Sequence, residues 1–205
     1  MQKLQGLYAI ADADCIGTDK IISKTKEVLA AGVKVIQYRD KVNTRDHRYK
    51  NAAALRRLTN NYKCLLLIND DVQLAKSIDA DGVHLGKNDA SIKQARKQLG
   101  KNKIIGASCY AKFENARTAI NASADYIAFG SFYPSATKPD APRAKIELLT
   151  QAKQEFNIPI CAIGGITPEN ATNLLTAGAD MIAVISAVFN ASSPKQAVQE
   201  YLLLM

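Results

Sequence analysis

Cationic and amide side chains end one of the first apolar segments of the chain. Residues 37–41 read QYRDK, so in an extended strand Gln37, Arg39 and Lys41 share one face. Arginine offers a planar fork of donors and lysine a point charge, and both bind phosphate oxygens. This spacing predicts an anion site. A solvated strand end, with Arg39 paired to a neighbouring carboxylate, accounts for the same segment.

Carboxylates end the next two apolar segments. Asp70 and Asp71 follow one of them, and Asp89 comes three residues after Gly86. Mg²⁺ typically takes one or two carboxylates together with waters and substrate phosphate oxygens, so Asp70 and Asp89 are candidate ligands. For Asp71 we favour an acid at a helix N-terminus. Asp89 could instead cap a helix that begins near Ala90.

Small and hydroxyl-bearing residues in the second half of the chain predict a further anion site. Ser135, Thr137 and Lys138 lie in a proline-flanked loop. The glycines at 164 and 165 and the Ile185–Ser186 pair each precede a predicted helix, where backbone N–H groups can face an anion. The glycines could instead serve only the shape of a turn.

Histidines and cysteines offer little chemistry in this sequence. His84 lies inside an apolar segment, which favours a hydrogen-bonded structural role over a catalytic base, and His47 is expected on a polar helix surface. The four cysteines are widely spaced and form no C-x-x-C pair, so we expect reduced, mostly buried thiols and neither zinc nor disulfides.

The candidate site residues must be positioned by a fold, and the pattern of the sequence predicts which one. Short β-branched segments alternate with segments of helical period along the whole chain. Strands are predicted at 6–12, 33–40, 64–70, 81–86, 103–109, 125–131, 158–166 and 181–189. Helices are predicted at 20–31, 44–61, 71–79, 90–99, 113–122, 143–156, 168–177 and 194–204. Eight such units predict an α/β fold, a single-domain (β/α)8 TIM barrel over residues 1–205, with the site at the carboxyl ends of the strands. The alternative, an open doubly wound sheet, often has a G-x-G-x-x-G after its first strand, and none is present here.

Composition narrows the class of protein. The 205 residues are 47% hydrophobic, with 27 Lys and Arg against 19 Asp and Glu, a net charge of +8. No stretch of about 18 residues is purely apolar and the start lacks the order of a signal peptide, so we expect no membrane span and a cytoplasmic location. A net charge of +8 would suffice for a nucleic-acid-binding module, but the sequence has no basic run or basic-aromatic strand, so we expect no nucleic-acid partner.

Taken together, the motifs resemble the thiamine phosphate synthase family over nearly the whole chain. The resemblance is carried by QYRDK, INDD, GVHLG, IGAS, FGSFYPSATK, AIGGI and GADMIAVISA. It implies an enzyme that joins hydroxymethylpyrimidine diphosphate to a thiazole phosphate, or to its carboxylated form, and releases diphosphate. Its cofactor would be one Mg²⁺ per active site.

Site residues are implied by matching the family motifs position by position. Pyrimidine diphosphate would contact Gln37, Tyr38, Arg39, Asp40, Lys41, Asn69, Ser108 and Lys138, of which Arg39, Lys41, Ser108 and Lys138 would be catalytic. The metal would contact Asp70 and Asp89, and the thiazole phosphate Ser135, Ala136, Thr137, Gly165, Ile185 and Ser186. Two positions depart from the family pattern: Ser135 replaces a common threonine, and Lys87 stands where glutamine is frequent.

Two neighbouring functions remain open at this point. A related thiazole tautomerase would isomerise the thiazole without needing the diphosphate and metal residues, and a phosphate-binding barrel could lack synthase chemistry altogether. The expected partners are small-molecule substrates, and the chain could form a homo-oligomer.

Overall fold

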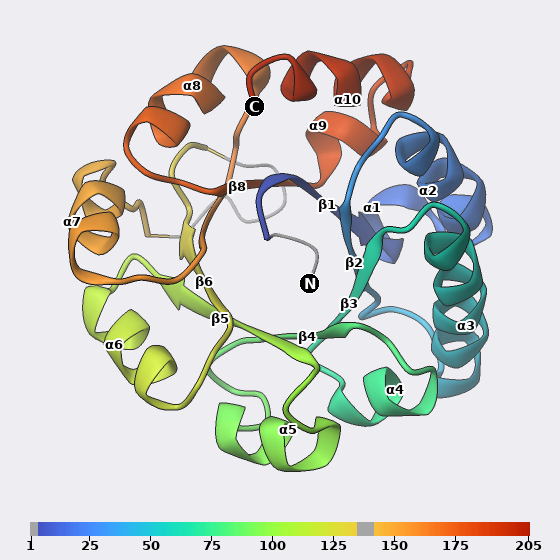
Figure 1. Ribbon diagram of the computed structural model, residues 1–205. Helices are drawn as coiled ribbons and strands as arrows, with labels where there is room; N and C mark the ends of the chain where they lie inside the picture. The colour runs from blue at the N-terminus through green and yellow to red at the C-terminus, as the bar shows by residue number, and fades with distance from the viewer. Residues whose placement is uncertain (1–3, 135–141) are drawn as a thin grey trace.

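Eight parallel strands close into a barrel in chain order, with helices forming a ring around it (Figure 1). The computed structural model describes residues 4–134 and 142–205. The strands are β1 (Gly6–Asp12), β2 (Val35–Arg39), β3 (Leu65–Asn69), β4 (Gly82–Leu85), β5 (Ile104–Tyr110), β6 (Tyr126–Gly130), β7 (Ile160–Ile163) and β8 (Met181–Val184). β1 pairs with both β2 and β8, which completes the ring. The predicted (β/α)8 barrel is therefore confirmed.

The helices within the described residues follow the expected rhythm, with three short additions. The longer ones are α2 (Ile21–Ala30), α3 (Arg45–Asn61), α4 (Val72–Ser77), α5 (Ile92–Leu99), α6 (Phe113–Asn121), α7 (Glu147–Glu155), α8 (Pro168–Thr176) and α10 (Pro194–Leu202). The additions are α1 (Ala13–Ile16), the 3-10 turn η1 (Thr18–Lys20) and α9 (Ser186–Phe189). These elements are too short for a helical period to show in the sequence.

Two predicted strands extend too far at their carboxyl ends. The strand expected at 158–166 stops at Ile163, because Gly164 and Gly165 adopt positive φ angles of 107° and 63° and turn the chain. The strand expected at 181–189 stops at Val184, and its last residues form α9 instead. Apolar residues continue through α9, so hydrophobicity alone could not distinguish its helix from the strand.

Alternating side chains divide the core into two layers. In β2, Val35 belongs to the cluster inside the barrel, whereas Ile36 and Tyr38 belong to the cluster between strands and helices. Gln37 follows Val35 on the inner face and is only 3% exposed. The period of two therefore aims Gln37, and after it Arg39, toward the barrel axis.

Three aspartates secure the amino ends of alternate strands. Each lies one residue before β4, β6 or β8. Its carboxylate accepts a hydrogen bond from a backbone N–H near the start of the preceding strand, and it forms an ion pair with a Lys or Arg of a neighbouring helix. The contacts are Leu66 N to Asp81 (2.7 Å) with Arg56, Ile105 N to Asp125 (2.7 Å) with Arg96, and Ile160 N to Asp180 (2.9 Å) with Lys153. This repeated contact links the strands to the surrounding helices and fixes their register. It lies at the amino ends of the strands, opposite the pocket end of the barrel.

We expect Gly82→Ala to lower the free energy of unfolding by about 3 kcal/mol, because overpacking of this kind forces backbone shifts. A Cβ at Gly82 would lie 2.0 Å from the carbonyl oxygen of Ile104 on the paired strand. Gly100→Ala is the matched control, since a Cβ there meets nothing within 4 Å and the cost is only that of φ +86°, about 1 kcal/mol. Urea denaturation measures both, and equal losses would contradict the prediction.

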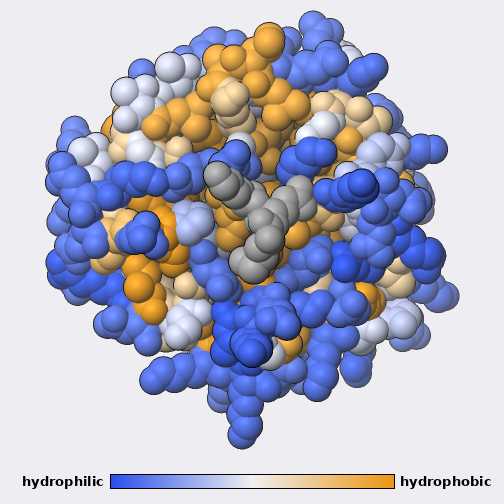
Figure 2. Space-filling view, in the orientation of Figure 1, coloured by the Kyte–Doolittle hydropathy of each residue, from blue (hydrophilic) through white to orange (hydrophobic). Residues whose placement is uncertain are grey.

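Exposed apolar side chains lie together at the last residues of the chain. In the view of Figure 2, hydrophilic side chains cover much of the rim, and apolar ones gather near the C-terminal end of α10. Leu203, Leu204 and Met205 are exposed there by 86%, 38% and 43%. Within the described part of the chain, no helix combines the length and apolar character needed to cross a membrane.

Candidate active site

A pocket of about 570 Å³ lies at the carboxyl ends of the strands. Among the predicted site residues it is lined by Gln37, Arg39, Asn69, Ser108, Gly165, Ile185 and Ser186. All eight strands or the loops that follow them supply these residues and their pocket neighbours, as expected for a barrel of this kind. A second hollow of about 660 Å³ lies at the opposite end, and none of the predicted site residues within 4–134 and 142–205 lines it.

Arg39 is held at the pocket by a buried carboxylate at the end of the neighbouring strand. Its Nη1 donates to Asp12 Oδ2 at 2.5 Å, and Asp12 is only 1% exposed. The other oxygen of Asp12 accepts from the backbone N of Asp14 and caps α1. Arg39 is therefore paired with a neighbouring carboxylate, as the alternative interpretation of this segment expected. It nevertheless lines the pocket. Asp12 is not among the residues predicted for the site, although its place at the end of the first strand could have indicated it.

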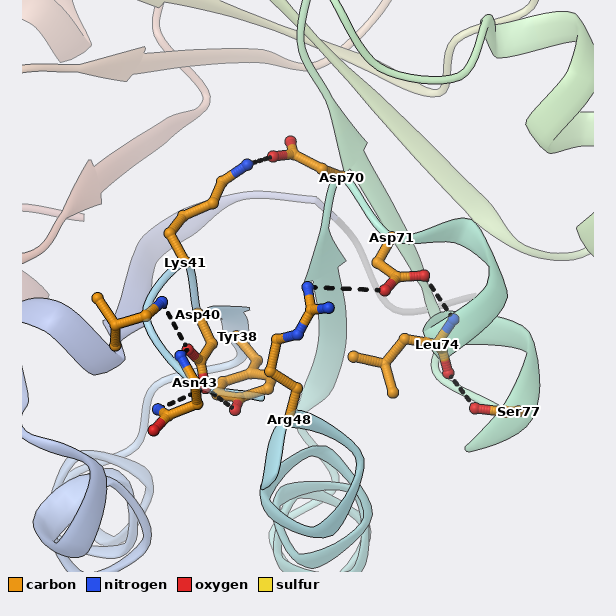
Figure 3. Close-up of polar contacts among 10 residues, drawn as sticks. Tyr38, Asp40, Lys41, Asn43, Arg48, Asp70, Asp71, Leu74 and Ser77 are labelled. Atoms are coloured by element: carbon orange, nitrogen blue, oxygen red, sulfur yellow. Dashed lines mark hydrogen bonds and ion pairs between the residues drawn. The ribbon is translucent and has the colours of Figure 1, made fainter. Parts of the chain in front are cut away.

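Lys41, Asp70 and Asp89 meet beside the pocket. The Lys41 ammonium forms an ion pair with Asp70 Oδ2, as Figure 3 shows. Asp89 Oδ2 accepts from the backbone N of Gly86 at 2.7 Å. Burial, together with the neighbouring Asp70 carboxylate, raises the pKa of Asp89. Two carboxylates this close repel each other, and a shared cation would relieve that repulsion.

This donor set fits a hard divalent cation. Carboxylate oxygens from adjacent strand ends are ligands that Mg²⁺ accepts, with substrate oxygens and water completing its shell. Across the described residues, no group of three or more His, Cys, Asp and Glu side chains forms a larger metal site. Ser91, not Asp89, caps α5, so the alternative role considered for Asp89 is wrong.

Asp71 turns away from these groups toward α4 (Figure 3). Its Oδ1 accepts from the backbone N of Leu74 at 2.8 Å and caps the helix, while Arg48 lies 3.9 Å from its other oxygen. The prediction that Asp71 is a helix N-terminal acid is confirmed.

Tyr38 and Asp40 do not line the pocket, in contrast to their expected substrate contact. Tyr38 points into the layer between strands and helices and donates its hydroxyl to Asp40 Oδ2 at 2.7 Å. Asp40 also accepts from the backbone of Val42 and Asn43. Burial alone would raise the pKa of Asp40, but the hydrogen bonds from Tyr38 and Asn43 outweigh it and hold that pKa below its usual value. The two residues instead shape the turn that presents Lys41, because alternation places them on the outer face.

The loops after β7 and β8 form the other side of the pocket. Gly164, Gly165, Ile185 and Ser186 line it together. Gly165 combines φ +63° with a close approach, since a Cβ there would lie 2.1 Å from the Pro134 carbonyl oxygen. Glycine is therefore required for the shape of this turn, and the same turn brings backbone to the pocket wall.

Comparison with known proteins decides the family. A family model described as thiamine monophosphate synthase matches residues 7–188. The chain belongs to this family. A thiamine-phosphate synthase of Thiobacillus denitrificans is 46% identical over 195 residues, covering 95% of this chain and 92% of that protein. One from Methylobacillus flagellatus is 47% identical over 198 residues, covering 97% and 94%.

Solved structures agree with this assignment to the thiamine monophosphate synthase family. The thiamine phosphate pyrophosphorylase of Pyrococcus furiosus superposes with a TM-score of 0.89 at 36% identity, covering 98% of this chain and 95% of that one. The resemblance stated from the motifs is thereby confirmed.

Four residues implied by the synthase motifs, Ser135, Ala136, Thr137 and Lys138, lie outside the described residues. Pro134 and Pro142, which flank this segment on its two sides, both line the pocket. Lys87, the other departure from the family pattern, is exposed, and its backbone N donates to the Tyr110 hydroxyl at 3.3 Å.

Beneath the pocket, sequence reasoning missed a set of contacts inside the barrel. Tyr8 and Tyr126 are fully buried, and their hydroxyls lie 2.9 Å apart. His84 contacts Tyr126 through Nδ1 (2.8 Å) and Ser108 through Nε2 (2.9 Å), so it is hydrogen-bonded inside the barrel as expected. Both tyrosines occupy inward positions of their strands, so the period of two could have indicated their orientation but not their partner.

Proposed function

We propose that this protein is a thiamine phosphate synthase, a transferase that joins hydroxymethylpyrimidine diphosphate to thiazole phosphate and releases diphosphate. The observation that carries the proposal is one pocket with two unlike sides. Arg39 and Asn69 line one side, with Lys41, Asp70 and Asp89 beside it, and the glycine turn after β7 lines the other. Family membership supports the same reaction.

The pyrimidine diphosphate is proposed to bind on the cationic side. Arg39 presents a fork of donors and Lys41 a mobile ammonium, and both neutralise charge that builds on the departing diphosphate. Lys41 would exchange its ion pair with Asp70 for the diphosphate. Lys138 is expected to add a third cation.

Asp70 and Asp89 are proposed to hold one Mg²⁺ through their carboxylates. When bound, the ion would act as a Lewis acid toward diphosphate oxygens. The Gly86 N–H, which donates to Asp89, fixes the orientation of that carboxylate.

The reaction is proposed to be a dissociative substitution. The bond between the pyrimidine methylene carbon and the diphosphate oxygen breaks, and its electron pair leaves with diphosphate. The electron-rich aminopyrimidine stabilises the cation at the methylene, and the lone pair of the thiazole nitrogen then forms the new C–N bond. Positioning of the two substrates supplies much of the rate.

No protein nucleophile is needed for this substitution, and the cysteines do not offer one. Burial raises the pKa of Cys64 and of Cys109 to about 12, so both thiols stay protonated at neutral pH. Ser108, next to Cys109, lines the pocket and is proposed to contact the pyrimidine.

The thiazole phosphate is proposed to bind at the loops after β7 and β8. Gly165, Ile185 and Ser186 offer backbone and hydroxyl groups there, with Ser135, Ala136 and Thr137 completing the site. This placement holds the thiazole nitrogen across the pocket from the diphosphate.

A product assay tests the proposal. Protein mixed with Mg²⁺, pyrimidine diphosphate and thiazole phosphate, with or without a thiazole carboxylate, is expected to form thiamine phosphate and diphosphate in equal amounts. Controls omit each substrate in turn. Isomerisation of the thiazole without pyrimidine would indicate a tautomerase, and binding without turnover by folded protein would indicate a phosphate-binding barrel; either result rejects the synthase assignment.

A further inference from the structure

A continuous chain of hydrogen bonds crosses the barrel beneath the pocket, from Gln37 on β2 to Ser108 on β5. Gln37 Nε2 donates to the Tyr8 hydroxyl at 2.6 Å. The chain then continues from Tyr8 to Tyr126, from Tyr126 to His84 and from His84 to Ser108, at the distances given above. Gln37, His84 and Ser108 line the pocket, whereas the two tyrosines do not. We call these five residues the relay.

The polarity of the relay follows from counting hydrogens. Each phenol carries one hydrogen. Within the described residues, the hydrogen-bond contacts of the Tyr8 oxygen are Gln37 and Tyr126. Because Tyr8 accepts from the Gln37 amide, its own hydrogen is directed to Tyr126, and the hydrogen of Tyr126 is in turn directed to His84 Nδ1.

This order determines the tautomer of His84. A neutral imidazole that accepts at Nδ1 carries its proton on Nε2. Nε2 then donates to Ser108 Oγ, and the hydroxyl hydrogen of Ser108 is released toward the pocket. The reverse order would use that hydrogen inside the relay and leave Ser108 only as an acceptor.

Burial keeps the two tyrosines of the relay protonated. It raises the pKa of Tyr8 and of Tyr126 above the usual phenol value, so neither loses its proton at physiological pH. The Tyr126 ring also stacks on His84, with centroids 5.6 Å apart and an interplanar angle of 27°, which restricts rotation of the imidazole. The two phenols therefore orient their neighbours through hydrogen bonds and stay uncharged.

We propose that the relay fixes Ser108 as a hydrogen-bond donor to an acceptor atom of the pyrimidine diphosphate, with Tyr8, Tyr126 and His84 as positioning residues. This inference rests on the proposed function for the identity of the ligand. The acceptor is either a pyrimidine ring nitrogen or a diphosphate oxygen, which share the required lone pair. Since the tyrosines do not reach the pocket, their effect on the reaction must pass through His84 and Ser108.

The test reads the tautomer of His84 directly in the ligand-free protein. The chain has two histidines, and the exposed His47 on α3 serves as an internal reference for ¹⁵N NMR of histidine-labelled protein. At mildly alkaline pH, where a free imidazole is neutral, we expect His84 to carry its proton on Nε2. Tyr126→Phe should move the two His84 nitrogen signals toward each other, because Nδ1 loses its donor and both tautomers become populated. Tyr8→Phe should give a smaller shift in the same direction, and it serves if Tyr126→Phe does not fold.

Tyr201→Phe is the matched control. Its hydroxyl is buried and donates to the Ile166 carbonyl at 2.8 Å, outside the relay, so this variant loses a comparable hydrogen bond. We expect the His84 signals of Tyr201→Phe to match those of the unaltered protein.

Kinetics link the relay to the ligand. Tyr126→Phe should lower kcat/KM for pyrimidine diphosphate roughly tenfold, leave KM for thiazole phosphate unchanged, and cost nothing further in a Ser108→Ala background. Pyrimidine diphosphate analogues that each lack one ring nitrogen identify the acceptor. If Ser108→Ala no longer lowers kcat/KM with one of these analogues, the missing nitrogen is the acceptor. If Ser108→Ala lowers kcat/KM with every analogue, the acceptor is a diphosphate oxygen.

Three results would overturn the proposal: a proton on Nδ1 of His84, unchanged His84 signals in Tyr126→Phe, or fully additive losses with Ser108→Ala. The NMR readout needs no substrate, so it remains decisive even if no thiamine phosphate forms. Failure of the proposed function would appear in the product assay alone.

Discussion

Asp70→Asn is expected to lose about a thousandfold in kcat/KM while the protein folds normally, because loss of this proposed metal ligand would remove several kcal/mol of charge stabilisation. Asp70 adopts φ +62°, a left-handed conformation that asparagine tolerates better than most residues. The substitution therefore removes charge with little backbone strain. Raising the Mg²⁺ concentration should restore part of the activity, since the Asp89 carboxylate remains.

Asp71→Asn is the matched control for this variant. The neighbouring Asp71 caps α4, and asparagine caps helices about as well as aspartate. We expect activity within about twofold of the unaltered protein, given the near-equal capping preference. Steady-state rates across a Mg²⁺ titration measure both variants. Full activity of Asp70→Asn at limiting Mg²⁺ would reject the proposed metal ligand.

The barrel could be predicted from sequence because its signal is local and repeated. A buried strand such as β3 needs only a short β-branched or leucine-rich segment, and Asp71 marks the start of the helix that follows. The predicted carboxyl ends of β7 and β8 were less accurate. Gly164 and Gly165 end β7 through backbone conformation, and the apolar residues of α9 give no sign that the chain has left the sheet.

Site residues at strand ends could be predicted because all parallel strands of a barrel end at one rim. Gln37 and Arg39 therefore needed only the strand assignment, whereas Ser108 was indicated by the family motif. The contact between Tyr8 and Tyr126 joins residues 118 positions apart, and no local pattern pairs one inward tyrosine with another. Interactions across the barrel depend on packing of all eight strands at once.

Asp12 carries the second large expected effect, because it holds Arg39 through a buried carboxylate that does not itself line the pocket. Asp12→Asn keeps an oxygen that can accept from the backbone N of Asp14 and cap α1, but it removes the carboxylate that faces Arg39 Nη1 at 2.5 Å. We expect kcat/KM for pyrimidine diphosphate to fall roughly a hundredfold, because a displacement of about 1 Å in a positioning group costs that much. KM for thiazole phosphate should change little, since its proposed site lies across the pocket.

Asp125→Asn is the control that separates an effect on the position of Arg39 from an effect on the stability of the fold. Asp125 also pairs with an arginine at 2.5 Å, but it does so at the amino end of β6, away from the pocket. Removing one partner of a largely buried ion pair destabilises the fold, so both variants should unfold at lower denaturant concentration. Only Asp12→Asn should lose activity when both are assayed well below their unfolding transitions. If Asp125→Asn lost as much activity, stability would explain both effects; if Asp12→Asn kept full activity, the remaining contacts of Arg39 would suffice to position it.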